Sequence, residues 1–148
     1  MRHNKDLDRY ELSIVRAFAG AVQCAYEQYG LDICDYLTGL FKTDIFNRFE
    51  EEHTVYVQGY HCIAGILLDE VKKLGITVKQ GDDNPGDAPV AYWMGYLFMY
   101  WKLLEHEMGN NFLKYDLEGI YWSYESLHTM SIPATIDSIK SEYGQRMS

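Results

Sequence analysis

Two copies of a Glu-x-x-His pattern are the residues in this chain best suited to chemistry. Glu50 stands three residues before His53, and Glu125 stands three residues before His128. At that spacing a carboxylate and an imidazole share one face of a helix. Four-helix proteins with a di-metal centre use two such pairs and one glutamate from each remaining helix. One hypothesis is therefore a metal-dependent enzyme with these four residues as ligands.

The same histidines also fit a purely structural role. His53 and His128 are each followed by threonine, at points where the apolar periodicity of the helix stops. Side chains at helix ends commonly hydrogen-bond to nearby carbonyl groups. The extra carboxylates that a di-metal site needs, Glu27 and Glu105, also lie near helix ends. We therefore expect helix-terminating histidines, with no catalytic residue, bound metal or cofactor.

Composition narrows the choice of partner. The 148 residues are 47% hydrophobic and 15% aromatic, which is enough for a buried core and argues against disorder. The formal net charge of −9 opposes direct binding to nucleic acid, whose phosphates are held by Lys and Arg. It favours a partner protein with a basic surface, toward which this chain would be steered.

The cysteines and the lengths of the apolar runs indicate the cellular compartment. Cys24, Cys34 and Cys62 are an odd set without paired spacing, so reduced thiols in a cytoplasmic protein are expected. The first six residues are polar and no apolar run of a signal peptide follows them. The longest apolar run ends at Trp101 and is shorter than the ~20 residues that cross a bilayer. No membrane association is predicted.

Helical periodicity runs through nearly the whole chain and predicts an all-α fold. Asp32 is an expected N-cap, Thr43 or Asp44 is expected to cap the next helix, and Gly30 and Gly75 are expected to end helices. The Asp-rich stretch 76–87 lacks the ligand spacing of a calcium loop and is interpreted as a solvated linker. It would join an N-terminal half, 1–75, to a C-terminal half, 88–148, in one packed domain. The expected helices cover 7–29, 31–40, 44–54, 58–74, 88–108, 111–115, 116–128 and a last segment from 132.

The helix expected to end at Met108 is the most aromatic part of the chain. Its apolar stripe covers most of the helix surface, which predicts a buried central element. We expect it to pack on both halves at once. Only its Tyr92 edge and its polar end, Glu105 to Glu107, would then reach a partner.

Residues 45–54 align with residues 120–129 without a gap. Ile, Glu, His and Thr match, and an aromatic residue stands over an aromatic residue twice. Identity fades outside this window. The pattern predicts a degenerate internal repeat of two helical halves.

Two short motifs resemble those of small uncharacterised bacterial helical proteins. They are Ala91-Tyr92-Trp93-Met94-Gly95-Tyr96, within the aromatic helix, and Tyr124-Glu125-Ser126-Leu127-His128-Thr129, before the final helix. Such families lie beside genes for ADP-ribosyltransferase-like toxins. The resemblance implies an antitoxin-like or accessory role.

The leading hypothesis is a non-enzymatic, antitoxin-like inhibitor that covers a basic protein surface. The protein itself could be a monomer or a homodimer. Other hypotheses are a phage-encoded inhibitor of a host defence nuclease, such as an anti-CRISPR, that mimics nucleic acid, and the metal-dependent enzyme described above. Exposed tyrosines and carboxylates would form the binding surface, since tyrosine is enriched at interfaces. The candidate partner-binding residues are Glu50, Glu51, Glu52, Tyr56, Tyr60, Tyr92, Glu105, Glu107 and Tyr121.

Overall fold

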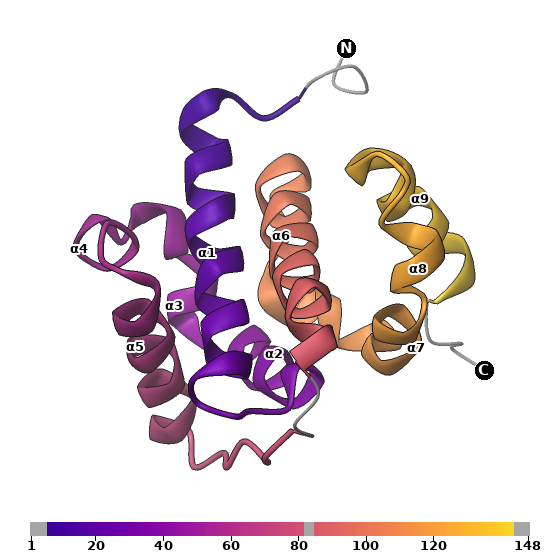
Figure 1. The fold of residues 1–148 in the computed structure, drawn as a ribbon. Coiled ribbons are helices and arrows are strands. Elements are labelled where there is room, and N and C mark those ends of the chain that lie inside the picture. The colour runs from indigo at the N-terminus through magenta and orange to yellow at the C-terminus, as the bar shows by residue number, and fades with distance from the viewer. Residues whose placement is uncertain (1–5, 82–84, 144–148) are drawn as a thin grey trace.

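Two long helices, α1 (Arg9–Glu27) and α6 (Ala88–Glu105), lie side by side at the centre of the molecule. The computed structural model describes residues 6–81 and 85–143. Figure 1 shows α3, α4 and α5 beyond α1 on one side, and α7, α8 and α9 beyond α6 on the other. The predicted compact all-α fold is confirmed. Among the described helices, none has the length and apolar character to span a membrane.

Helix α6 is buried because apolar side chains surround most of its axis. It packs on α1 from the first half of the chain and on α9 (Ile132–Glu142) from the second. Gly95 permits the close crossing with α1, since a Cβ there would lie 3.0 Å from the Cα of Ala19. Pro89 stands in the first turn, where the missing N–H is not needed.

The ends of the first helices follow their capping residues. Asp8 and Glu11 form a capping box at the start of α1. Gly30 adopts a positive φ of 67° where the chain turns into α2 (Ile33–Phe41). Asp32 caps α2 by accepting the Asp35 N–H, and Thr43 accepts the Phe46 N–H at the next helix. The predicted Asp32 cap is confirmed, and of the two candidates Thr43 and Asp44, Thr43 is the N-cap.

The expected helix over 44–54 is three short pieces instead. They are α3 (Asp44–Asn47), the 3-10 helix η2 (Phe49–Glu51) and α4 (His53–Tyr56). Because the helix is interrupted at Arg48, the side chains of Phe46 and Phe49 both point into the core. There both rings meet Phe18 edge-on. The expectation that His53 ends a helix is therefore wrong, because His53 begins α4.

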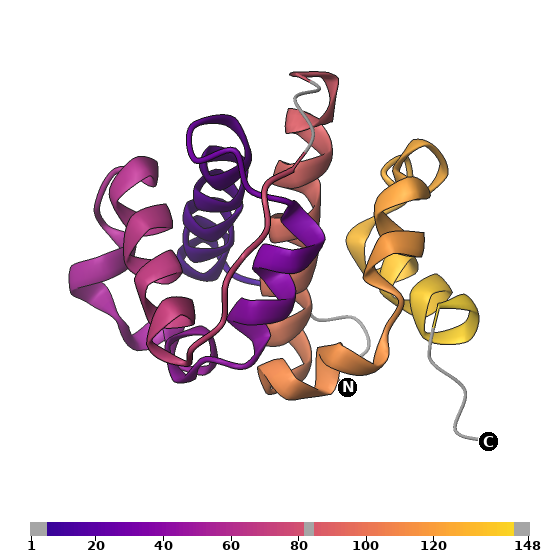
Figure 2. The ribbon, with the colours of Figure 1, turned by 90° about the horizontal axis from the view of Figure 1, so that it is seen from below.

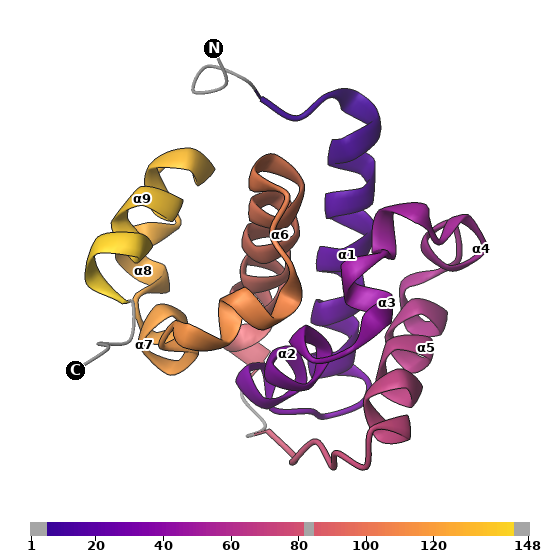
Figure 3. The ribbon, with the colours of Figure 1, turned by 180° about the vertical axis from the view of Figure 1, so that it is seen from behind.

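Residues 76–81 are a largely exposed loop that is held against α2. They follow α5 (Tyr60–Lys73) and run extended beside the start of α2, as Figures 2 and 3 show. The Lys79 N–H donates to Asp35, and Lys79 C=O accepts the Asp32 N–H. Val78 is buried. The rest of the Asp-rich stretch includes residues 82–84, which lie outside the described residues, and the 3-10 helix η3 (Pro85–Asp87).

The second half also departs from prediction at its helix ends. Helix α6 ends at Glu105 rather than Met108, because His106 adopts a left-handed φ of 55°. The 3-10 helix η4 (Gly109–Lys114) follows. The expected helix over 116–128 is divided at Ser123 into α7 (Leu117–Trp122) and α8 (Tyr124–Leu127). Ser131 then caps α9.

The two halves share one aromatic core. Phe41 of α2 contacts Phe98 of α6 and Phe112 of η4 at ring-centroid distances of 5.2 and 5.3 Å. Trp101, 1% exposed, stacks on Phe98 and meets Phe112 edge-on. Each such ring contributes about 1.5–3 kcal/mol on burial, so this cluster joins α2, α6 and η4 firmly.

Candidate functional site

A groove lined by aromatic rings runs between α6 and the α8–α9 segment. Its volume is about 580 Å³. The side chains that line this aromatic groove are Gln23, Pro89, Tyr92, Trp93, Tyr96, Tyr124, His128 and Ile132. Helical spacing places Trp93 and Tyr96 on the α6 face of the groove. Because ring faces and edges dominate its surface, the groove is suited to flat or cationic side chains.

One residue that lines the groove carries a buried, unsatisfied donor. Trp93 is 8% exposed, and its Nε1 has no hydrogen-bond partner within the described part of the chain. The Trp93 ring meets Tyr124 edge-on at 5.5 Å, and Tyr124 stacks on His128 at 4.2 Å. A buried N–H without an acceptor costs about 1–3 kcal/mol. An occupant that brings an acceptor to Nε1 would recover that cost.

Further tyrosines lie near the groove along α6 and on α5. The Tyr92 and Tyr96 rings are 6.1 Å apart, and Tyr96 stacks on Tyr100 at 6.1 Å. Burial raises the pKa of Tyr92, and the nearby Tyr60 and Tyr96 phenols raise it further. Tyr60 is half exposed and lies against α1 at Gly20, where a Cβ would be 2.5 Å from its ring. The structure thus brings together two predicted binding residues, Tyr60 and Tyr92.

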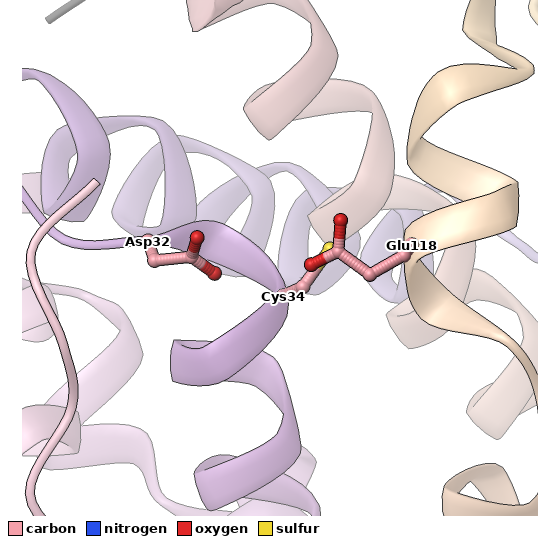
Figure 4. A group of neighbouring side chains, drawn as sticks. All are labelled: Asp32, Cys34 and Glu118. Carbon is pink, nitrogen blue, oxygen red and sulfur yellow. The ribbon is translucent and has the colours of Figure 1, made fainter. Parts of the chain in front are cut away.

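A second feature is an acidic cleft between the N-termini of α2 and α7. It consists of two adjoining hollows of about 160 and 290 Å³ that share Asp32, Cys34 and Glu118. One ligand atom from each of these three residues lies within 4.8 Å of the others. Figure 4 shows the two carboxylates approaching Cys34 from separate elements.

Part of the acidic cleft is engaged in contacts within the molecule. Burial raises the pKa of the Cys34 thiol well above its usual range, and the charges of Glu118 and Asp32 raise it further. The thiol lies within 4.8 Å of a Glu118 carboxylate oxygen, while Asp32 caps α2. Asp32 is the N-cap of α2 and Glu118 lies in the first turn of α7, positions where the helix dipole stabilises negative charge. A divalent cation could bind these three groups only by displacing the thiol proton.

The aromatic groove and the acidic cleft adjoin each other. Gln23 lines the groove and Tyr26, one turn later on α1, lines the cleft. At the start of α6, Pro89 lines the groove and Asp87 lines the cleft. Tyr124 lines the groove, and the cleft is lined by residues of α7 immediately before it. The two features are therefore lined by neighbouring residues at three places in the chain.

Most of the carboxylates predicted to bind a partner are engaged within the molecule. Glu50 pairs with the amine of Lys102, whose side chain is 3% exposed. Glu52 pairs with Arg48. Glu105 accepts both the Trp101 indole N–H, at 2.9 Å, and Lys140, at 2.8 Å.

Two further predicted carboxylates differ from each other. Glu107 is half-buried and accepts a hydrogen bond from Asn111 at 2.8 Å. Glu51 is exposed on η2. The acidic surface is therefore more dispersed than the sequence pattern suggests, and the acidic cleft provides a concentration of carboxylates that was not predicted.

The two remaining tyrosines predicted to bind a partner, Tyr56 and Tyr121, lie in different environments. Tyr56 is 8% exposed and hydrogen-bonds to the Tyr10 hydroxyl, so the expectation that it faces a partner is wrong. Tyr121 is half-buried and lines the acidic cleft. The sequence alone does not show which of these two tyrosines is buried, because burial of a tyrosine on a short helix depends on which elements pack over it.

The two Glu-x-x-His pairs do not form one metal site. Among residues 6–81 and 85–143, one group of three His, Cys, Asp or Glu side chains converges, and it contains none of Glu50, His53, Glu125 and His128. His128 ends α8, and its Nδ1 lies 2.6 Å from the Tyr124 carbonyl, as the helix-capping interpretation predicts.

Comparison with known proteins does not extend this description. The chain matched no family model, no curated protein and no solved structure. The proposed function below therefore rests on the geometry of this chain.

Proposed function

We propose that this protein is a non-enzymatic, antitoxin-like inhibitor that binds a basic protein partner through its aromatic groove. The observation that carries the proposal is the groove itself. It presents Tyr92, Tyr96 and Tyr124 around a nearly buried tryptophan, on a chain with a net charge of −9. Tyrosine and tryptophan in a concave surface are typical of interface centres.

The mechanism would be occlusion. Long-range attraction between the acidic chain and a basic surface raises the rate of encounter. The aromatic groove then fixes the position of the partner, and the bulk of the inhibitor covers the partner's basic site. Buried reduced cysteines at positions 24 and 34 fit a cytoplasmic setting for this interaction.

Two alternative functions receive less support. A nucleic-acid mimic needs a row of carboxylates directed outward, whereas Glu50, Glu52 and Glu105 are paired with cations. The di-metal enzyme needs convergence of the Glu-x-x-His pairs, which the described residues do not show.

Affinity capture from the native host, followed by an activity assay, tests the proposal. The wild-type protein should retain a basic protein and inhibit its activity. A Tyr92→Ser, Tyr96→Ser double variant should lose both effects. Val57→Ser is the control, because Val57 is 68% exposed and lies on α4's side of the molecule, away from the groove. Equal capture and inhibition by all three proteins would overturn the proposal.

A further inference from the structure

We infer that the aromatic groove and the acidic cleft together bind one extended, arginine-bearing segment of the partner. One guanidinium would lie over the tyrosine rings of the groove and a second would pair with Glu118 in the cleft. This inference rests on the proposed function and adds the chemistry of the bound segment.

The chemistry of the groove favours a guanidinium. The face of a tyrosine ring carries negative charge density and attracts cations within about 6 Å. Tyr92 and Tyr96 are tilted by 34° at 6.1 Å, so that both are available along one wall. Arginine suits such a wall better than lysine, because its planar group stacks on rings and is weakly hydrated.

The unsatisfied Trp93 N–H favours an extended segment over a helix. An extended chain has main-chain carbonyls that are not used in its own hydrogen bonds, whereas a helix interior has none to offer. The Trp93 ring lies edge-on to Tyr124, which is only partly buried. Because Nε1 is buried, neighbouring side chains must shift on binding before a main-chain carbonyl can accept from it.

The acidic cleft supplies the complementary charge beside the groove. Glu118 is exposed on the first turn of α7, and Asp32 is partly exposed opposite it. A carboxylate can accept two parallel hydrogen bonds from one guanidinium. Because the Cys34 thiol stays protonated, it does not compete as a second anion. Lys79 lines the outer hollow, which directs the incoming cation to the inner one beside Asp87 and Tyr121.

Titration calorimetry with a synthetic probe tests the inference on the full chain. The probe is a short, unstructured Gly/Ser peptide with two arginines, prepared with several spacings between them. We expect one spacing to bind best, and replacement of either arginine by neutral citrulline to weaken binding about tenfold. A peptide with glutamates in place of both arginines should show no binding.

Protein variants assign each arginine to its site. Tyr96→Leu should weaken binding about tenfold and remove the effect of citrulline at one position only. Glu118→Gln should do the same at the other position. Trp93→Phe removes the N–H donor and should weaken every peptide about threefold. Val57→Ser should bind like wild type, and thermal melts of all variants should confirm that they are folded.

The outcomes separate this inference from the proposed function. If citrulline peptides bind as well as arginine peptides, or if neither Tyr96→Leu nor Glu118→Gln changes binding, the inference is wrong. Should partner capture still depend on Tyr92 and Tyr96 in that case, the proposed function stands with another kind of segment. If the arginine peptide binds as expected while no host protein is captured and inhibited, the proposed function is wrong and the site assignment stands.

Discussion

Segments 45–54 and 120–129 match in sequence but have different roles in the molecule. Each is interrupted at the corresponding position, Arg48 in the first and Ser123 in the second, and consists of short helical pieces. The first segment is built into the core, where Phe49 is fully buried. The second lies at the surface, where the corresponding Tyr124 lines the aromatic groove.

The difference arises from what lies beneath each segment. Under the first, α6 presents the buried amine of Lys102, which Glu50 neutralises, and α1 presents Phe18. The second segment meets the start of α6 at Trp93, and the groove stays open beside it. A shared local pattern therefore fixes where the chain bends. It does not fix whether the segment supports the core or forms a binding surface.

The largest expected contrast concerns the aligned aromatic residues. Phe49→Ala should lower the free energy of unfolding by about 4 kcal/mol, because it empties a packed site in the core. Tyr124→Ala should lower it by only about 1 kcal/mol, since that ring is half-buried beside an open groove. Urea denaturation of both variants measures the contrast. Equal losses would mean that the two segments have equivalent structural roles.

The next contrast concerns the aligned glutamates. Glu50→Ala should cost about 3 kcal/mol, because the 3% exposed Lys102 amine loses its partner inside the protein. Glu125→Ala is the matched control and should change stability by less than about 0.5 kcal/mol, as expected for an exposed side chain. A double variant, Glu50→Ala with Lys102→Met, should recover part of the loss. No recovery would argue that the ion pair is not the cause.

For the aligned histidines, the larger loss of stability is expected in the second segment. His128→Ala removes both a hydrogen bond to the Tyr124 carbonyl and a stacked ring at 4.2 Å, so we expect a loss of about 1 kcal/mol. His53→Ala, at the exposed start of α4, should cost about half as much. Neither variant should change the metal content of the purified protein. A larger loss at His53 would contradict the assigned roles.

The smallest expected effect is a pH dependence at Tyr56, which follows the first segment on α4. The hydrogen bond to Tyr10, together with burial, raises the pKa of Tyr56 from 10.0 to about 12. Folding therefore favours the neutral phenol. Its stabilisation is complete below about pH 10 and is lost as the pH rises toward 12. The free energy of unfolding should fall less steeply with rising pH in Tyr56→Phe than in wild type over this range. Identical slopes in the two proteins would refute the assignment.

Local patterns in the sequence were sufficient for the all-α fold and for several helix ends. Asp32, Thr43 and Gly30 act as predicted, because capping depends on a few neighbouring residues. The division at Arg48 and the left-handed His106 were missed, since both depend on packing between distant segments.

The candidate site was harder to predict for the same reason. Tyr92 was identified by its place on the edge of the aromatic helix, and it does line the groove. Glu118 and Cys34 come from different halves of the chain and meet only through the packing of α2 against α7. Nothing in their sequence spacing could indicate that proximity. Glu50 was assigned to the surface because its run of three glutamates conceals the contact with Lys102.

Site-specific photo-crosslinking in the native host tests the central claim most directly. A photoreactive residue would replace Tyr96 in the aromatic groove, Glu118 in the acidic cleft, or Val57 on the opposite side. The account predicts that positions 96 and 118 crosslink to the same basic protein, and that position 57 yields no such product. Crosslinking from position 57 alone, or to unrelated proteins from positions 96 and 118, would contradict it.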